Sequence, residues 1–368
     1  MRRSVRWLGY LQIGALVVGL SEGRALAQIT PAAGYTPPDD TPSIRVGTTL
    51  FADYSYTTSP ETTDTDGNTI HNSAFNVTRA YVNITGQISH VVAFRLTPDV
   101  TRETGTGSSL NGSLMYRIKY AYAQVNLDDW LPRTYTRLGI QQTPYLDYAE
   151  GIYRYRFQGT MFPEREGYFA SADGGASIHH NFAGNFGDVH VGYFNGENYN
   201  KAEVNDQKAF IVRAAVRPLA RMTPIWRGLR LSGFYQGDHY IKDADRTRAI
   251  FLGTFEHPYV VAGFEYLSAA DQTSVTKPKV DSRGYSIWAT PRSPKGFEAL
   301  LRYDHLIPND SFDDQARNRT IIGAAYWFPH QGNVSSAMML DYDGQTFKNF
   351  TPAPPSVKRV AVHALVTF

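Results

Sequence analysis

Residues 295–306 read KGFEALLRYDHL, and their side chains alternate between two kinds. One side carries the apolar or aromatic Phe297, Ala299, Leu301 and Tyr303, and the other carries the charged Glu298, Arg302 and Asp304. A period of two is that of a β-strand with one apolar and one polar face. A slip of one residue would exchange the two faces, so the charged residues fix the register of this strand.

The same pattern of about ten alternating residues followed by a polar break recurs along the chain. A tilted strand needs about 9–11 residues to cross a bilayer. The pattern predicts sixteen strands, at 44–57, 75–88, 90–100, 115–127, 134–143, 172–182, 186–195, 208–218, 228–238, 245–256, 258–268, 283–291, 296–306, 317–328, 334–344 and 358–368.

The connections between these segments are long and short in strict turn. Residues 58–74 and 101–114 form long connections, whereas residue 89 and residues 128–133 form short ones. Outer-membrane barrels show this asymmetry, with long extracellular loops and short periplasmic turns, and a soluble β-sandwich has no reason to show it. We therefore expect residues 44–368 to form an all-β, sixteen-stranded antiparallel transmembrane barrel.

The charged face of each strand must then meet water. A buried arginine without a partner is costly, and an arginine that faces lipid at the bilayer midplane costs about 2–4 kcal/mol. Sixteen strands enclose an aqueous channel, whereas eight fill with side chains. The alternation places Arg79, Arg95, Arg213 and Arg302 on the lumen side, together with Glu298. Glu298 and Arg302 share a face, and as a pair they would either steady the wall or shape the local field.

Two local features refine the barrel. The alternation changes phase within RIKYAYAQVNL (117–127), which predicts a β-bulge. Aromatic residues near segment ends fit interfacial girdles. These residues are Tyr54, Tyr56, Tyr193, Tyr235, Tyr259, Tyr266, Trp327 and Phe328.

The two ends of the sequence carry sorting patterns. Arg2, Arg3 and Arg6 precede an apolar run, and Ala25-Leu26-Ala27 follows, which predicts a cleaved signal peptide over 1–27. Residues 28–43 contain four prolines and read as an extended periplasmic lead-in. The last segment, KRVAVHALVTF, ends on Phe368, which resembles the assembly signal read by the outer-membrane insertion machinery.

Several stretches resemble the porin O/P family of phosphate-selective porins. They are NVTRAYVNITGQIS (76–89), VGYFNGENYN (191–200), AFIVRAAVRPL (209–219), KGFEALLRYDHL (295–306) and the terminal Phe368. The resemblance implies a sixteen-stranded homotrimeric barrel, an inward-folded third loop and arginines along the conduction path. Its counterparts here are Arg79, Arg95, Arg137, Arg213 and Arg302.

The third long connection, residues 144–171 (here the third loop), is expected to form the constriction. It holds the basic residues Arg154, Arg156 and Arg165 and the acidic residues Asp147, Glu150, Glu164 and Glu166. Rings of basic residues select anions. Because the loop mixes both signs, we expect a weak anion preference, set by the lumen arginines and softened by Glu164, Glu166 and Glu298.

Composition excludes other classes. The 368 residues have a mean hydropathy of −0.35 and no cysteine, and no apolar run approaches the ~18 residues of a membrane helix. Without residues 1–27 the chain has 32 basic and 33 acidic residues, so nucleic-acid binding has no support. His179, His180 and His190 read as lumen or turn residues rather than metal ligands, and DTDGN (64–68) reads as a loop turn.

The sequence thus predicts a non-enzymatic porin of the bacterial outer membrane, without a cofactor, that passes small anions or polar solutes. Lipids and lipopolysaccharide would surround it. Two alternatives stay open at this point. One is a barrel enzyme of phospholipase type with a Ser–His pair at the outer rim, and the other is a plugged structural or adhesive barrel.

Overall fold

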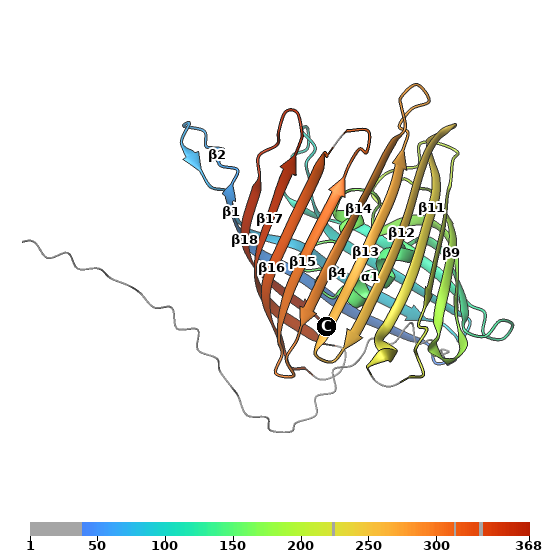
Figure 1. Ribbon diagram of the computed structural model, residues 1–368. Coiled ribbons are helices and arrows are strands. Elements are labelled where there is room, and N and C mark those ends of the chain that lie inside the picture. The colour runs from blue at the N-terminus through green and yellow to red at the C-terminus, as the bar shows by residue number, and fades with distance from the viewer. Residues whose placement is uncertain (1–38, 223–224, 313, 331–333) are drawn as a thin grey trace, which may run out of the picture.

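The computed structural model describes residues 39–222, 225–312, 314–330 and 334–368, and the predicted signal peptide lies outside these ranges. Sixteen strands form one closed antiparallel barrel, as predicted (Figure 1). They are β1 (Ser43–Ser59), β4 (Ser73–Gln87), β5 (Val92–Arg102), β6 (Leu114–Asn126), β7 (Thr134–Gln142), β8 (Ala172–Asn181), β9 (Gly187–Phe194), β10 (Ala209–Val216), β11 (Leu229–Ile241), β12 (Ala244–His257), β13 (Val260–Asp271), β14 (Val280–Pro291), β15 (Phe297–Ile307), β16 (Ala316–Phe328), β17 (Ser335–Lys348) and β18 (Val357–Thr367).

The barrel closes between its first and last strands. Each strand pairs with its neighbours in sequence, and β1 pairs with both β4 and β18. Phe368 extends the seam, since its amide donates to the carbonyl of Thr48 at 2.9 Å and its carbonyl accepts from Thr48 N at 3.0 Å. The closed ladder leaves no free sheet edge, which is the condition for a β-structure in lipid.

The predicted alternation of faces holds in β10 and β15. In β10 the Phe210 side chain is 46% exposed on the outer face, whereas Arg213 is 2% exposed on the inner face. β15 repeats the pattern, with Leu301 exposed and Arg302 buried. The outer surface is therefore apolar and the inner surface is polar, the arrangement of a membrane barrel.

The predicted bulge lies in β6. Thr97 of β5 faces Tyr120, but the next residue, Pro98, faces Ile118, so Lys119 is the extra residue. Lys119 and Tyr120 are both buried, and Ile118 and Val125 are exposed on either side. The bulge therefore turns two consecutive polar side chains inward, which the alternation could not do.

The connections are less regular than predicted. On the side of the long loops, β11 and β12 are joined by residues 242–243 alone, with Asp243 in the left-handed conformation (φ 64°). On the opposite side, residues 217–228 are long and include the 3₁₀ turn η2 (Trp226–Gly228). The strict alternation of loop length was therefore wrong at these two places, because a tight hairpin can replace a long loop.

Helices and short strands occupy some connections. The third loop contains α1 (Pro144–Tyr153) and α2 (Phe162–Arg165), and η1 (Ala183–Asn185) joins β8 to β9. No helix in the described ranges is long and apolar enough to cross a membrane. The first long connection carries the hairpin of β2 (Thr62–Thr63) and β3 (Thr69–Ile70), and DTDGN forms its turn, as predicted.

One member of the predicted aromatic girdles points the other way. The seven others are partly or fully exposed at the outer surface, but Trp327 packs against the buried core. Its indole lies 5.8 Å from the ring of Tyr155 and 4.2 Å from the Arg154 guanidinium carbon. Trp327 is therefore an anchor for the third loop, and its assignment to a girdle was wrong.

A histidine clamp ties the lead-in to the barrel. His90, in the turn between β4 and β5, lies 2.5 Å through Nδ1 from Asp40 and 3.0 Å through Nε2 from Asp129. The two carboxylates raise the pKa of His90 to about 9, and the same contact lowers the pKa of Asp40. The clamp therefore joins three segments at the short-turn end of the barrel.

We expect the clamp to depend on pH. Because the pKa of His90 is raised above its unfolded value of about 6.5, its stabilisation is complete below that pH and is lost as pH rises through about 9. His90→Gln should therefore lower the melting temperature of the folded protein at pH 6 and have little effect at pH 10. His71→Gln, whose ring lies 3.9 Å from Glu61, is the control. A melting difference that stays constant from pH 6 to pH 10 would contradict the clamp.

Candidate functional site

The inner face of the barrel is a network of arginines and carboxylates. Cross-strand pairs join Arg79 to Asp99 at 3.1 Å and Arg319 to Asp343 at 2.7 Å. Arg359 shares Asp343 at 3.2 Å. These pairs satisfy buried charges that would otherwise be very costly. The polar face is therefore an ordered wall and not a set of free charges.

The backbone of the third loop is bonded to this wall. Arg213 Nε donates to Pro144 O at 3.0 Å, Arg302 Nη1 to Thr160 O at 3.1 Å, and Arg248 Nε to Tyr168 O at 2.9 Å. Carbonyl groups of irregular backbone need such partners when they are removed from water. Arginines of β10, β12 and β15 supply them, so the wall and the loop are one hydrogen-bonded unit.

Side chains strengthen this attachment. Gln158 donates to Asp341 at 2.7 Å, and Arg317 pairs with Glu166 at 2.5 Å. The buried core of the protein lies between the loop and β9 to β18, and it reaches Phe51 on β1. Its aromatic members are Tyr145, Tyr153, Tyr155, Phe157, Phe162 and Phe169 from the loop with Phe51, Phe194, Phe234 and Trp288 from the wall. Apolar packing thus holds the loop against one side of the barrel.

Three of the predicted pore-lining residues are covered by this packing. Arg213 pairs with Asp188 beside α1, and Arg302, 4% exposed, pairs with Asp304 at 2.7 Å and contacts Tyr153. Glu298 does not pair with Arg302. It lies 3.6 Å from Arg154 and 3.7 Å from Arg292 and accepts from Tyr155 OH at 2.9 Å. These residues hold the loop and do not line the main cavity described below.

The other three lie on β4, β5 and β7. Arg79 is half-buried in β4 and lines the main cavity. Arg95 donates to Asn83 at 2.8 Å and lies 4.5 Å from the Tyr120 ring. Arg137 donates to Gln124 at 2.9 Å and lies over the rings of Tyr122 and Tyr135. Of these three, Arg79 lines the main cavity and Arg95 lines a second one.

The charged residues of the third loop contact either one another or the wall and cavities of the barrel. Arg156 pairs with Glu150 at 2.6 Å and Glu164 at 3.3 Å, so this triad is internal to the loop. Asp147 lines a cavity of about 200 Å³ behind α1, whereas Arg154 and Glu166 bind wall residues. Arg165 donates to the amide oxygen of Gln158 at 3.0 Å, and it lines the main cavity together with Arg156. The loop thus presents Arg156 and Arg165 to the main cavity.

The main cavity, of about 520 Å³, lies between the third loop and strands of the first and last parts of the barrel. Its basic lining residues are Arg79, Arg102, Arg117, Arg156, Arg165, Arg319 and Arg359. Its acidic lining residues are Asp53 and Asp343. A second cavity, of about 250 Å³, is lined by Arg45 and Arg95. Arginine therefore dominates the charge along this side of the interior.

Sequence reasoning missed much of this lining. Arg319 and Arg359 share the inner parity of their predicted strands, so the alternation contained the signal. Arg117 and Lys119 lie beside the bulge, where the change of phase conceals their common face. Tyr199 lies in the connection 195–208, outside every strand, so the alternation of side chains gives no information about it.

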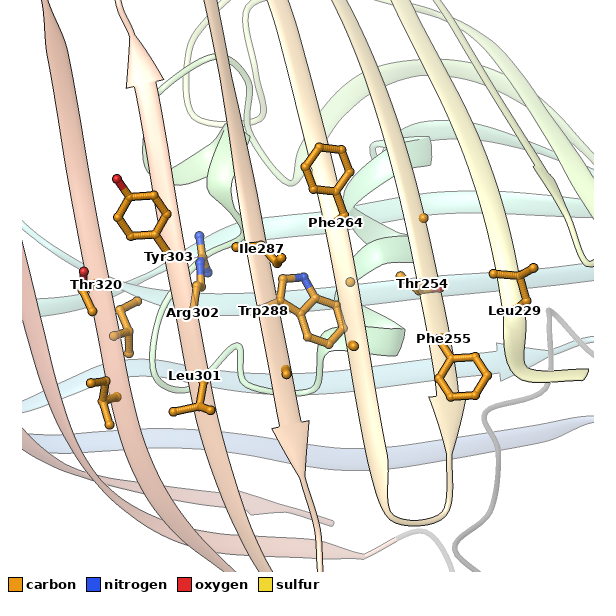
Figure 2. A pocket seen from close by; sticks show the side chains of 16 residues that line it. Leu229, Thr254, Phe255, Phe264, Ile287, Trp288, Leu301, Arg302, Tyr303 and Thr320 are labelled. Carbon is orange, nitrogen blue, oxygen red and sulfur yellow. The ribbon is translucent and has the colours of Figure 1, made fainter. Parts of the chain in front are cut away.

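A hollow on the outer surface has a different character. It measures about 630 Å³ and lies over β11 to β16 (Figure 2). The small residues Gly253, Ala262 and Ala289 leave space between bulkier apolar side chains such as Phe264 and Leu301. A predominantly apolar groove on the lipid-facing side of a barrel suits an acyl chain better than a hydrophilic solute.

Two Ser–His contacts bear on the enzyme alternative. Ser177 Oγ lies 3.0 Å from His190 Nε2, but it donates to the amide oxygen of Gln141 at 2.6 Å. His330 lies in the short connection between β16 and β17, and its Nε2 is 2.6 Å from Oγ of Ser336 at the start of β17. A nucleophilic serine needs its proton directed at the base and a third group that orients the base. Neither contact has this arrangement at the outer rim.

The histidines form a packed pair. The rings of His179 and His190 stack with centroids 4.9 Å apart, and His179 Nε2 lies 2.6 Å from Asp188. Within the described ranges, no three His, Asp or Glu side chains are arranged to hold a metal ion. The pair lies against the wall beneath α1, where it contributes to packing and to the hydrogen-bond network.

Comparison with known proteins bears on the fold. No family model matches the chain, and no curated protein matches it. An anion-selective porin from Comamonas acidovorans is 11% identical with a TM-score of 0.61, over 89% of this chain and 100% of that one. The loop L8 deletion mutant of OmpT, an outer membrane protein of Vibrio cholerae, is 14% identical with a TM-score of 0.61 over the same shares. The outer membrane channel DcaP of Acinetobacter baumannii is 12% identical with a TM-score of 0.57, over 89% and 97%.

The fold is that of outer-membrane porins. Identities this low establish architecture alone, so the resemblance to the phosphate-selective family stays a prediction. The comparisons agree with the closed barrel of sixteen strands, and the function is argued below from the residues of the interior.

Tyr145 offers a test of how the third loop is held. Its hydroxyl donates to the buried Glu265, and its ring packs 5.4 Å from Phe234. Tyr145→Phe keeps the ring but leaves the carboxyl without that donor, which should cost about 1–3 kcal/mol. Hydrogen exchange of residues 145–153 should accelerate accordingly. Tyr235→Phe, on the outer face, should leave this exchange unchanged, and equal protection in both variants would show that the hydrogen bond does not hold the loop.

Proposed function

We propose that the protein is an outer-membrane porin through which small hydrophilic solutes diffuse, with a weak preference for anions. The observation that carries the proposal is the cavity lined by seven arginines and two aspartates. Structural similarity to an anion-selective porin from Comamonas acidovorans also supports a preference for anions. Phosphate is one solute that such a lining would accept.

The preference arises from local and not from net charge. After removal of residues 1–27 the chain is nearly neutral, and at physiological salt charges are screened beyond about 8 Å. A solute in the cavity passes within that distance of the lining. Arginine stays protonated at any working pH and binds oxyanions through its planar fork of donors. The lining therefore attracts anions without a long-range field.

The third loop is the proposed constriction. Its backbone and most of its aromatic side chains are bound to β10 to β18. The main cavity lies between the loop and residues of β1, β4, β5, β6, β16, β17 and β18. Arg156 and Arg165 of the loop face Arg79 and Arg117 of the wall across the cavity. The conduction path would run between these two sets of arginines and continue past Arg95.

Export and assembly follow the same proposal. The signal peptide over 1–27 would be cleaved and the lead-in would lie in the periplasm beside the short turns. The insertion machinery would recognise the last strand through Phe368, whose ring is 73% exposed on the outer face. Lipids and lipopolysaccharide would cover the apolar surface, and three copies would form the homotrimer.

Reversal potentials in a salt gradient test the selectivity. Arg79→Gln, Arg117→Gln and Arg319→Gln combined should lower the permeability of chloride relative to potassium, because they remove three charges that line the cavity. Arg283→Gln, exposed at the end of β14, is the matched control and should leave the ratio unchanged. A wild-type channel that prefers cations, or a triple variant with an unchanged ratio, would contradict the proposal.

Single-channel conductance tests the constriction. Replacing residues 154–160 by two glycines should raise the conductance, because this segment forms one side of the cavity. A shortening of the exposed connection 272–279 by the same number of residues is the control. Heat-modifiable migration would confirm that both barrels are folded. Unchanged conductance in a folded loop variant would place the constriction elsewhere.

A further inference from the structure

Two tyrosine hydroxyls in the interior accept hydrogen bonds from cations. Lys119 Nζ donates to the hydroxyl of Tyr81 at 2.9 Å, and Arg117 Nη2 donates to the hydroxyl of Tyr199 at 2.7 Å. Both cations belong to β6 beside its bulge. Tyr81 lies in β4, whereas Tyr199 comes from the loop 195–208, so residues distant in sequence meet at one place.

The two cations lack acidic partners. Neither Lys119 nor Arg117 forms an ion pair with any carboxylate of the described residues, although Lys119 is only 1% exposed. Tyrosine rings surround Lys119 instead, with their centroids 4.9 Å (Tyr81), 5.6 Å (Tyr120) and 5.8 Å (Tyr199) from Nζ. The faces of aromatic rings stabilise a cation but do not neutralise it. Arg117 therefore brings to this site a positive charge that no carboxylate of the described residues balances and that an anion would balance.

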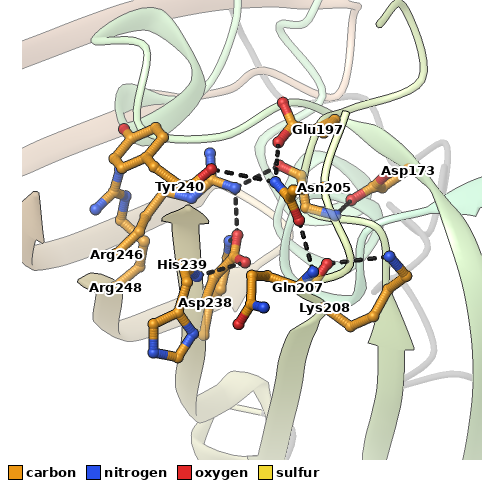
Figure 3. Close-up of polar contacts among 12 residues, drawn as sticks. Asp173, Glu197, Asn205, Gln207, Lys208, Asp238, His239, Tyr240, Arg246 and Arg248 are labelled. Atoms are coloured by element: carbon orange, nitrogen blue, oxygen red, sulfur yellow. Dashed lines mark hydrogen bonds and ion pairs between the residues drawn. The ribbon is translucent and has the colours of Figure 1, made fainter. Parts of the chain in front are cut away.

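The loop that carries Tyr199 is fixed in place (Figure 3). Gly196 N donates to Asp173 Oδ2 and Arg246 Nη2 donates to Gly196 O, each at 2.8 Å. Asn205 donates to Tyr240 O at 3.1 Å, and Tyr199 N donates to Ala172 O at 3.1 Å. These bonds tie both ends of the loop to β8, β11 and β12. Tyr199 is thus positioned by the fold.

Each hydroxyl has a proton to give. In the part of the chain that the structure describes, the hydroxyls of Tyr81 and Tyr199 accept a bond but donate none. A hydroxyl that accepts from a cation becomes a stronger donor through cooperative polarisation. Two partly exposed hydroxyl donors without a protein acceptor therefore lie beside the neighbouring residues Arg117 and Lys119, and Arg117 lines the main cavity.

We propose that Tyr81 and Tyr199, polarised by Lys119 and Arg117, form a binding station for small oxyanions on the conduction path. The proposal rests on the porin function above and names the class of solute that the path retains: ions that carry phosphoryl or carboxylate oxygens. Hydroxyl and guanidinium donors match the directional lone pairs of such oxygens. Chloride has no such directionality, so it passes with weaker retention.

Anion binding at the station can be measured as block of the chloride current. In a planar bilayer, inorganic phosphate and, separately, acetate are titrated against a constant chloride gradient. Tyr81→Phe and Tyr199→Phe each keep the ring and remove the donor. Each should raise the phosphate concentration for half block about threefold to tenfold, and the double variant should raise it further. The chloride current of each variant without phosphate is the reference for its own block.

Tyr240→Phe is the matched control. It lies at the same end of the barrel and near Arg246, but its hydroxyl already donates to Asp271 at 2.8 Å. It should leave the phosphate block unchanged. Loss of both phosphate and acetate block in the Tyr81 and Tyr199 variants supports a general oxyanion station, and loss of phosphate block alone restricts it to phosphoryl groups.

Three results would overturn the inference. A conducting wild type that phosphate does not block, or variants with unchanged block, would show that the hydroxyls bind no solute while leaving the porin function intact. Tighter block in the variants would show that the hydroxyls mask the cations. A folded wild-type barrel without conductance would overturn the porin function itself and this station with it.

Discussion

The arginines that point into this barrel need hydrogen-bond acceptors, and this requirement governs the structure of the interior. Alternation puts many guanidinium groups on the inner face, and an unpartnered guanidinium removed from water is costly. Carboxylates on neighbouring strands satisfy some of them, as Asp343 does for Arg319 and Arg359. Carbonyl groups of the third loop satisfy others, including Arg213 and Arg302. The same requirement therefore builds the wall and fastens the loop.

Apolar packing then makes the interior asymmetric. The third loop brings a buried aromatic cluster against β10 to β18, where the wall offers Phe234, Leu252, Leu267 and Trp288. No comparable cluster of described residues faces β4, β5 and β6, where Arg79, Arg95 and Arg117 lie. One side of the barrel is thus filled like a soluble core, and the other keeps an open charged path.

Sequence periodicity predicted the strands well because each strand obeys one local rule. All sixteen predicted segments overlap the observed strands, and the bulge in β6 was visible as a change of phase. Parity says which face a side chain takes but not what covers it. Arg213, Arg302 and Trp327 lie on the inner face, as the alternation along their strands requires. The third loop nevertheless covers them. Helix α1 and residues 154–160 cover these side chains, and their position follows from packing over long sequence separations.

The chain is nearly neutral, but its main cavity is lined mostly by arginines. The positions of the acidic side chains explain this difference. Glu265 and Glu298 lie under the third loop, and Glu150 and Glu164 are engaged with Arg156 inside it. Asp343 is shared between two arginines, and Arg165 binds an amide in place of a carboxylate. Acidic groups are thus committed to holding the loop, while Arg102, Arg117 and Arg165 face the cavity without an acidic partner in the described ranges. The contacts that fix the loop in place are the same contacts that leave the open side basic.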